Sequence, residues 1–287
     1  MKIEKLSDDF RFGSNASLLE NRTVLFWGLN RANIKKTSLY KQFLDDGRNL
    51  SFSMDNKVLT VKNELLTQTH KDVVEALLIL CDTSSTDAIH ISHSSILTAL
   101  QKNSKNVFWL DEILEELNNV NFRYFLKNEN FDTVSATGFK ILDNLSYDDV
   151  SGAIIFSFNA SFLSLYAEGK VFDYAKYTPF IANLDHDISK QVVRWLLTYS
   201  NLQINIKNLL SIKLGLANVV TGSTINRYVV RLKKEDLSMF GIWVDGDNIC
   251  IDRTKEIGFF DGVAVDKLRG TEKIKIKQST LPFFDMN

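Results

Sequence analysis

One order of elements occurs twice along this chain and constrains its fold more than any other feature. In the second half, apolar residues at helical spacing predict helices over 188–198, 206–214 and 222–239. Two short apolar runs, 242–244 and 249–251, then flank Asp245-Gly246. Asp-Gly between two such runs is a strong signal for a hairpin. Three helices closed by a two-stranded hairpin form the arrangement of a winged helix.

The first half shows the same order. Helices are predicted over 69–80, 92–100 and 105–117, and strands over 121–126 and 133–142 follow them. Outside this group the pattern predicts a hairpin of strands 50–54 and 57–61, a strand over 153–158, and an apolar helix over 161–166. We therefore predict an α+β fold of tandem winged-helix domains, each with three helices and a hairpin wing. The boundaries are a flexible N-terminal arm over 1–20, a first domain over 21–172 and a second domain over 173–287.

The charge is divided unevenly between the two halves. The whole chain has 34 Lys and Arg against 35 Asp and Glu, a net charge of −1. Residues 186–287 hold 15 basic against 11 acidic residues, whereas residues 1–185 hold 19 against 24. A surface that is basic throughout is excluded, and the second domain is the half suited to a polyanion.

The third predicted helix of the second half is the best candidate for reading DNA. At 100° per residue, Arg227, Arg231 and Lys234 fall within about 60° of one another, while Ile225, Val229 and Leu232 form an apolar stripe on the other side. Polar residues at the N-terminal end of a recognition helix reach base edges. A solvent-exposed amphipathic face is the alternative interpretation. The candidate DNA-binding residues on this segment are Ser223, Thr224, Asn226, Arg227, Arg231, Lys233 and Lys234.

Two further segments carry charge in a regular pattern. Alternation puts Lys273, Lys275 and Lys277 on one face of a strand, where they would suit a phosphate backbone or protect a sheet edge equally well. The third helix of the first half instead carries Asp111, Glu112, Glu115 and Glu116. These acids would repel phosphate, so we expect a protein contact or a solvated face there, with Glu112 and Glu116 affecting self-association.

The sequence lacks the motifs of the common catalytic and metal sites. Cys81 and Cys250 form no CxxC pair, which excludes a cysteine zinc site and favours buried thiols in a reducing cytoplasm. His90 and His93 are three residues apart, so on a strand they would face opposite sides, unlike the paired histidines of nicking enzymes. No apolar run is long enough to span a membrane. We predict a cytoplasmic protein that is not an enzyme, with no metal and no cofactor.

The chain resembles the TrfA-like plasmid replication initiators. The resemblance begins at Asn21-Arg22 and Leu25-Phe26, and continues through Val58–Val73, which contains a Leu-x-Gln-x-x-x-Asp-Val signature. It resumes at Phe139–Asp143 and Ala153–Leu165, and ends with Tyr177–Tyr199. Members of this family are often basic, whereas this chain is neutral overall.

This resemblance implies two winged helices that bind repeated double-stranded sites (iterons) at a plasmid origin. It also implies origin opening, recruitment of the host replicative helicase with the host initiator protein, and a homodimer in equilibrium with an active monomer. Ser223–Lys234 would be the main recognition helix, and the wing Trp243–Ile251 would lie near the backbone or the minor groove. The first domain would supply dimer contacts and secondary DNA contacts.

Two other functions remain open at this stage. A winged-helix transcriptional regulator, including an autorepressor without initiator activity, could use the same helix, although the sequence has no separate sensor module. A nicking replication enzyme would need paired histidines and a reactive tyrosine.

Overall fold

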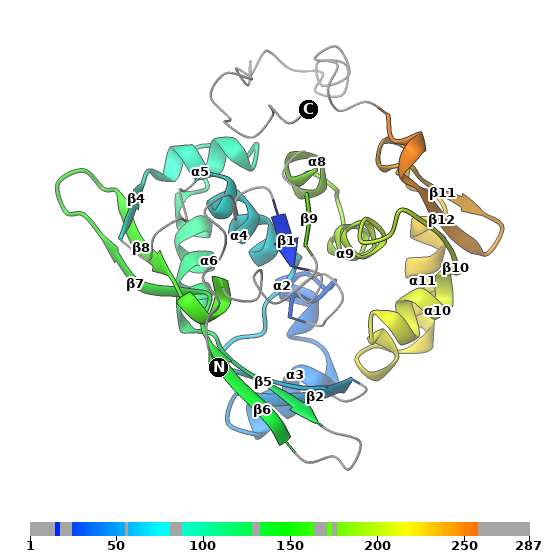
Figure 1. Cartoon of the computed structure of the whole chain (residues 1–287), viewed down its shortest axis with the longest axis horizontal. Coiled ribbons are helices and arrows are strands. Elements are labelled where there is room, and N and C mark those ends of the chain that lie inside the picture. Colours follow the sequence, from blue (N-terminus) through cyan, green and yellow to red (C-terminus); the bar gives the residue numbers. More distant parts are fainter. Residues whose placement is uncertain are drawn as a thin grey trace.

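The chain folds into helices and antiparallel sheets, an α+β architecture, in a computed structural model of the protein (Figure 1). The structure describes residues 15–17, 25–54, 57–80, 88–127, 133–163, 171–173 and 177–257. Within that part, no helix is long and apolar enough to cross a membrane.

A four-stranded sheet lies at the bottom of the view in Figure 1. Its strands, in spatial order, are β2 (Asn49–Met54), β3 (Lys57–Lys62), β5 (Asn121–Lys127) and β6 (Thr133–Phe139). Short helices α2 (Arg31–Ile34) and α3 (Ser38–Asp45) precede it. The two hairpins predicted around residues 55–56 and 128–132 are confirmed by the antiparallel pairing of β2 with β3 and of β5 with β6.

The position of the second hairpin differs from the expectation that it closes the first three helices as a wing. β5 pairs along its length with β3, so β5 and β6 extend the β2–β3 hairpin. The physical reason is that the apolar residues of β5 match those of β3 in register: Phe122 faces Val61, and both are buried.

The three helices of the first half are α4 (Gln68–Leu80), α5 (His93–Ala99) and α6 (Val107–Asn119). They are closed by a three-stranded sheet of β4 (Ile89–Ile91), β8 (Ile154–Phe158) and β7 (Leu142–Tyr147), in that spatial order. We call these three helices and three strands the first unit. In it β4, which follows the first helix α4, pairs with the last strand, β8. The hairpin that follows α6 in this sheet is β7–β8.

The second half, which we call the second unit, repeats this pairing. It contains α8 (Thr178–Ala182), α9 (Asp187–Leu196), α10 (Ile206–Asn208) with a π-helical turn over Leu209–Lys213, and α11 (Gly222–Leu232). Its sheet has the order β10 (Asn201–Asn205), β12 (Asn248–Asp252), β11 (Ile242–Asp245). Here β10, the strand after α9, pairs with the last strand, β12. Short 3-10 turns occupy Leu216–Asn218, Ser238–Phe240 and Arg253–Lys255.

Two predicted boundaries in this half differ from the structure. α9 spans Asp187–Leu196, with His186 as its N-cap residue, so it begins one residue before and ends two residues before the predicted helix over 188–198. The third helix ends at Leu232, seven residues before the predicted end. The chain must turn there because Leu237 and Phe240 are both buried and Gly241 adopts a positive φ of 67°.

The apolar residues form two clusters that meet at α4 and α9. The first cluster is built from residues 25–163 together with Ala182 and Val219, and the second from residues 177–251. Tyr228 packs against both. The proposed domain boundaries at 21, 172 and 173 stay predictions.

Part of the predicted N-terminal arm is a strand. β1 (Asn15–Ser17) pairs antiparallel with β9 (Val171–Asp173), so these three residues are held by backbone hydrogen bonds rather than free. The rest of segment 1–20 lies outside the described residues, as do residues 164–166 of the predicted helix 161–166, whereas 161–163 are helical.

Candidate nucleic-acid interface

Helix α11 forms because the sequence supplies a capping residue at its start and apolar residues at helical spacing along its length. Thr221 is the N-cap, and its side-chain oxygen accepts a hydrogen bond from the Thr224 backbone N–H at 3.4 Å. Ile225 and Leu232 are buried and Val229 is half-buried, which confirms the predicted apolar stripe. The stripe holds the helix on the second cluster and leaves the opposite side to solvent.

The solvent side of α11 carries five of the seven DNA-binding residues predicted on this segment. Ser223, Asn226, Arg227, Arg231 and Lys234 are all exposed and lie on one side of the helix or just beyond its end. Val230, 52% exposed, lies among them. The structure therefore places three cations and two small polar side chains on one open face.

The remaining predicted residues of this segment have local roles as well. Thr224 is half-buried, and its hydroxyl accepts a hydrogen bond from Arg227 Nη2 at 2.9 Å, which orients that guanidinium near the start of the helix. The Arg231 guanidinium lies 6.0 Å from the Tyr228 ring centre. Both arginines are therefore partly held in place before a ligand binds. Because of this, they lose less side-chain freedom on binding.

Lys233 points away from the open face. Its ammonium group lies 2.6 Å from Asp247 in the turn between β11 and β12. The hydrogen bond from Lys233 lowers the pKa of the Asp247 carboxyl. This ion pair ties the end of α11 to the tip of the hairpin, so the two elements form one surface. Lys273, Lys275 and Lys277 lie outside the described residues.

The acidic helix α6 is partly engaged within its own chain. Arg31 forms ion pairs with Glu112, at 3.0 Å, and with Glu116. Glu116 also accepts a hydrogen bond from the buried His70, at 2.6 Å. Burial by itself would raise the pKa of Glu116, but His70 and Arg31 lower it below its ordinary value. A change at Glu116 would therefore disturb folding, so Glu116 is a poor probe of self-association.

His93 lies beside a tyrosine, but the surroundings oppose nucleophilic chemistry. The His93 ring stacks on Tyr147 with centres 6.0 Å apart, and His93 Nε2 lies 2.8 Å from Asp111 Oδ1. Burial and the nearby Asp111 and Glu115 raise the pKa of the Tyr147 hydroxyl. A nucleophilic tyrosine would need the opposite shift.

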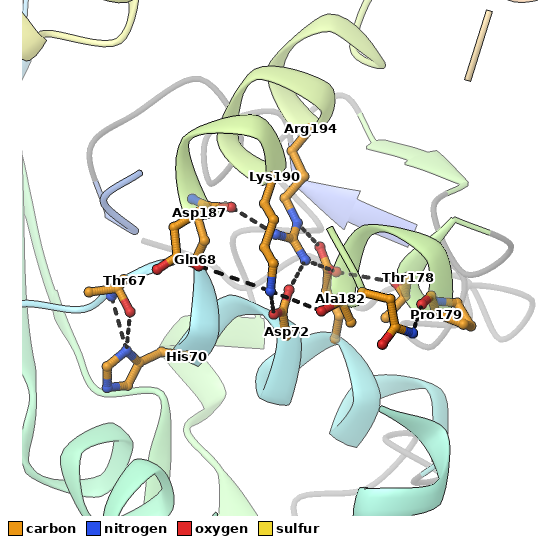
Figure 2. Close-up of polar contacts among 12 residues, drawn as sticks. Thr67, Gln68, His70, Asp72, Thr178, Pro179, Ala182, Asp187, Lys190 and Arg194 are labelled. Carbon is orange, nitrogen blue, oxygen red and sulfur yellow. Dashed lines mark hydrogen bonds and ion pairs between the residues drawn. The ribbon is translucent and has the colours of Figure 1, made fainter. Parts of the chain in front are cut away.

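Sequence reasoning missed a buried ion network between α4 and α9 (Figure 2). Arg194 donates to Gln68 Oε1 at 2.7 Å, to Asp72 Oδ1 at 2.7 Å, and to both Glu75 oxygens at 2.6 and 3.0 Å. Lys190 donates to Asp72 Oδ2 at 2.5 Å and to the Ala182 carbonyl at 3.0 Å.

All four charged side chains of this network are at least 93% buried. Burial lowers the pKa of Arg194, but Glu75 and Asp72 outweigh that effect, and the pKa stays above its ordinary value. The sequence does contain a signal for this network. Asp72 and Glu75 are three residues apart on α4, and Lys190 and Arg194 are four residues apart on α9. Such a pattern is usual for exposed helix faces, so it did not point to a buried contact.

Comparison with known proteins gives little further information. No protein-family profile and no curated protein matches the chain. The solved structures that are similar to it include two crystal structures of domains 2 and 3 of RctB, one of them a selenomethionine derivative. Each aligns with 71% of this chain and 90% of its own, with a TM-score of 0.48 and 12% identity. That similarity is too low to transfer a family or a function.

Proposed function

We propose that this chain is a replication initiator that binds repeated double-stranded DNA sites through α11 and the β11–β12 hairpin. The observation that carries the proposal is the open face of α11, where Arg227, Arg231 and Lys234 surround small polar side chains. Arg can bind guanine through two hydrogen bonds, and Asn226 can bind adenine in the same way. The exposed Lys233–Asp247 ion pair connects the hairpin turn to the end of this helix.

Both units fit the winged-helix arrangement on this proposal. In each, the strand after the first helix pairs with the last strand of the hairpin that follows the third helix. α11 would be the recognition helix of the second unit, and β11–β12 would be its wing. In the first unit the wing would be β7–β8 rather than the β5–β6 hairpin.

The resemblance to TrfA-like initiators favours an initiator over a transcriptional regulator that uses the same helix. On this basis the partners would be origin DNA, the host replicative helicase and the host initiator protein, with a homodimer in equilibrium with the monomer. The chain would act by binding rather than by catalysis. The acidic surroundings of Tyr147 support this choice over a nicking enzyme. Phosphate contacts by Lys273, Lys275 and Lys277 belong to the same proposal.

Gel-shift titrations with DNA that flanks the chain's own gene test this proposal, at two salt concentrations and with random competitor DNA. Complexes that resist competitor and increase in discrete steps are expected for repeated sites. A single specific complex would favour a simple regulator, and a smear abolished by salt would mean only non-specific phosphate contact.

Arg227→Ala and Arg231→Ala are the variants that test the helix itself. If the arginine reads a base, each change should cost about 1–3 kcal/mol of binding free energy and relax specificity at one position. If it contacts phosphate, binding should weaken uniformly and the salt slope should fall by about one. Lys41→Ala, which removes an exposed cation from α3, is the control. Unchanged affinity in both arginine variants would remove α11 from the proposal.

A further inference from the structure

Val230 is an apolar residue on the solvent side of α11, and the contacts proposed above give it no role. Its side chain is 52% exposed, whereas the adjacent Val229 packs against the second apolar cluster. At an exposed helical position valine is less favourable than alanine or the long polar residues, because its branched side chain loses rotational freedom. Val230 therefore contributes little to the fold of α11 and is available to bind a ligand.

The helical period places Val230 in the middle of the open side of α11. Asn226 precedes it by four residues and Arg227 by three, so both are its neighbours on the helix surface. The buried Ile225 and Leu232 lie on the opposite side of the helix. A ligand that covers Asn226 and Arg227 therefore covers Val230 as well.

The charged residues around Val230 restrict which apolar group can reach it. Arg227, Arg231 and Lys234 are exposed on the same side, and together they attract a polyanion. An extended apolar protein surface would bury these cations without partners, at a high cost in free energy. Duplex DNA instead offers phosphates to the cations and, in its major groove, an apolar group on every thymine, the C5 methyl.

Asn226 and Val230 have the spacing of nearby base pairs. Four residues of α-helix rise about 6 Å, and successive base pairs lie about 3.4 Å apart along the duplex. An asparagine can form two hydrogen bonds with adenine, and a small apolar side chain packs on the methyl group of thymine. With Asn226 on an adenine, Val230 reaches bases within about two steps of it.

We infer that Val230 contacts the C5 methyl group of a thymine in the major groove and selects thymine at one position of each binding site. The inference rests on the proposed function and adds to it a specificity-determining residue and one base identity. Cytosine has no methyl group and presents an N4 amino donor. Val230 would leave that donor without an acceptor, so a C·G pair is disfavoured at this position.

Deoxyuridine tests the contact, because it lacks the C5 methyl group of thymine and keeps the same base-pairing edge. The DNA segment that forms competitor-resistant complexes in the gel shift is prepared as duplexes with one thymine at a time replaced by deoxyuridine. For the wild-type chain we expect a loss of about fourfold in affinity at one position of each repeat, the effect of one buried methyl group. That position should lie within about two base pairs of the one at which Asn226→Ala relaxes specificity.

Val230→Ala completes a double-mutant cycle with deoxyuridine. The variant should bind the thymine duplex at least about fourfold more weakly than wild type, and deoxyuridine at the sensitive position should then cost nothing more. Its unfolding free energy should not fall, because alanine is the better helix former at an exposed position. Leu44→Ala is the control, since it truncates a 47% exposed side chain on α3. It should respond to deoxyuridine as the wild type does.

The outcomes separate this inference from the proposed function. Stepwise, competitor-resistant complexes in which no deoxyuridine lowers wild-type affinity overturn the methyl contact and leave the proposed function standing. Equal losses in wild type and Val230→Ala at every position overturn the contact as well, because the methyl group is then read by another residue or through DNA shape. A chain that forms no competitor-resistant complex overturns the proposed function together with the contact.

Discussion

His70 and Arg194 are polar residues whose roles depend on burial. His70 is fully buried, and the backbone N–H of Thr67 donates to its Nδ1 at 3.0 Å. Nδ1 is therefore unprotonated, and Nε2–H donates to Glu116. Burial lowers the pKa of His70, and Glu116 opposes that effect only in part. The neutral ring is thus the form that the folded chain stabilises, and it connects α4 to α6.

The lowered pKa of His70 predicts how stability depends on pH. In the unfolded chain the ring takes up a proton near pH 6.5, whereas in the folded chain it does so only at lower pH. The stabilisation is complete above the unfolded value and is lost as the pH falls from there towards the folded pKa. Denaturant unfolding from pH 7 to pH 5 should show this decline, and His70→Gln should flatten it. The exposed His90 gives the control variant His90→Gln, and parallel curves for wild type and His70→Gln would contradict the assignment.

At the scale of elements, α11 depends on a short hydroxyl cluster at its start. Thr221 Oγ1 lies 2.9 Å from Ser223 Oγ and 3.2 Å from Thr224 Oγ1, in addition to capping the Thr224 N–H. Thr224 in turn receives Arg227. The cap therefore supports both the first turn of the helix and the orientation of Arg227 on the exposed side of α11.

Thr221→Ala removes this cap and tests its contribution. We expect a loss of about 1 kcal/mol of unfolding free energy, because one backbone N–H of the first turn loses its partner. DNA affinity should also fall, since the first turn that positions Arg227 becomes less ordered. Thr221→Ser keeps the oxygen and should restore both. A Ser variant as weak as the Ala variant would show that the methyl group, rather than the cap, is responsible.

At the scale of the whole molecule, the α4–α9 ion network sets the relative position of the two units. Asp72 and Glu75 come from the first half, and Lys190 and Arg194 come from the second. Thr178 adds a hydrogen bond to Glu75 at 3.1 Å. Close packing accompanies the charges: a Cβ on Gly28 would lie 2.2 Å from Gln191 Oε1 on α9. Charges in such a site are stable only as a set, because each would be costly alone.

Arg194→Met should therefore destabilise the protein by about 3–5 kcal/mol, since Glu75 would be left buried without a cation. Denaturant unfolding followed by tryptophan fluorescence measures this loss. Adding Glu75→Gln to Arg194→Met should recover part of it, because the uncompensated charge is then gone. The control Arg48→Met breaks the exposed pair with Glu64 and should cost at most about 1 kcal/mol. Equal losses in the two single variants would refute a special role for the network.

Most of the local structure could be predicted from the sequence. The three helices of each half, the hairpins around 55–56 and 245–248, and the exposed basic side of α11 depend on residues within one or two turns of one another. Periodicity and turn chemistry carry that information. Errors remained where a distant contact decides the outcome: α11 ends early because Leu237 and Phe240 pack into the second cluster, and β1 is a strand because it pairs with β9.

Two features were decided by the tertiary structure alone. The β5–β6 hairpin follows α6 directly in the chain, yet it joins β3 because Phe122 and Val61, more than sixty residues apart, match in register. Asp72 and Arg194 had the spacing of solvated helix faces, yet they are buried against each other. Local sequence specifies which elements form, whereas desolvation and pairing between distant segments decide which charges become internal and which remain exposed to bind a partner.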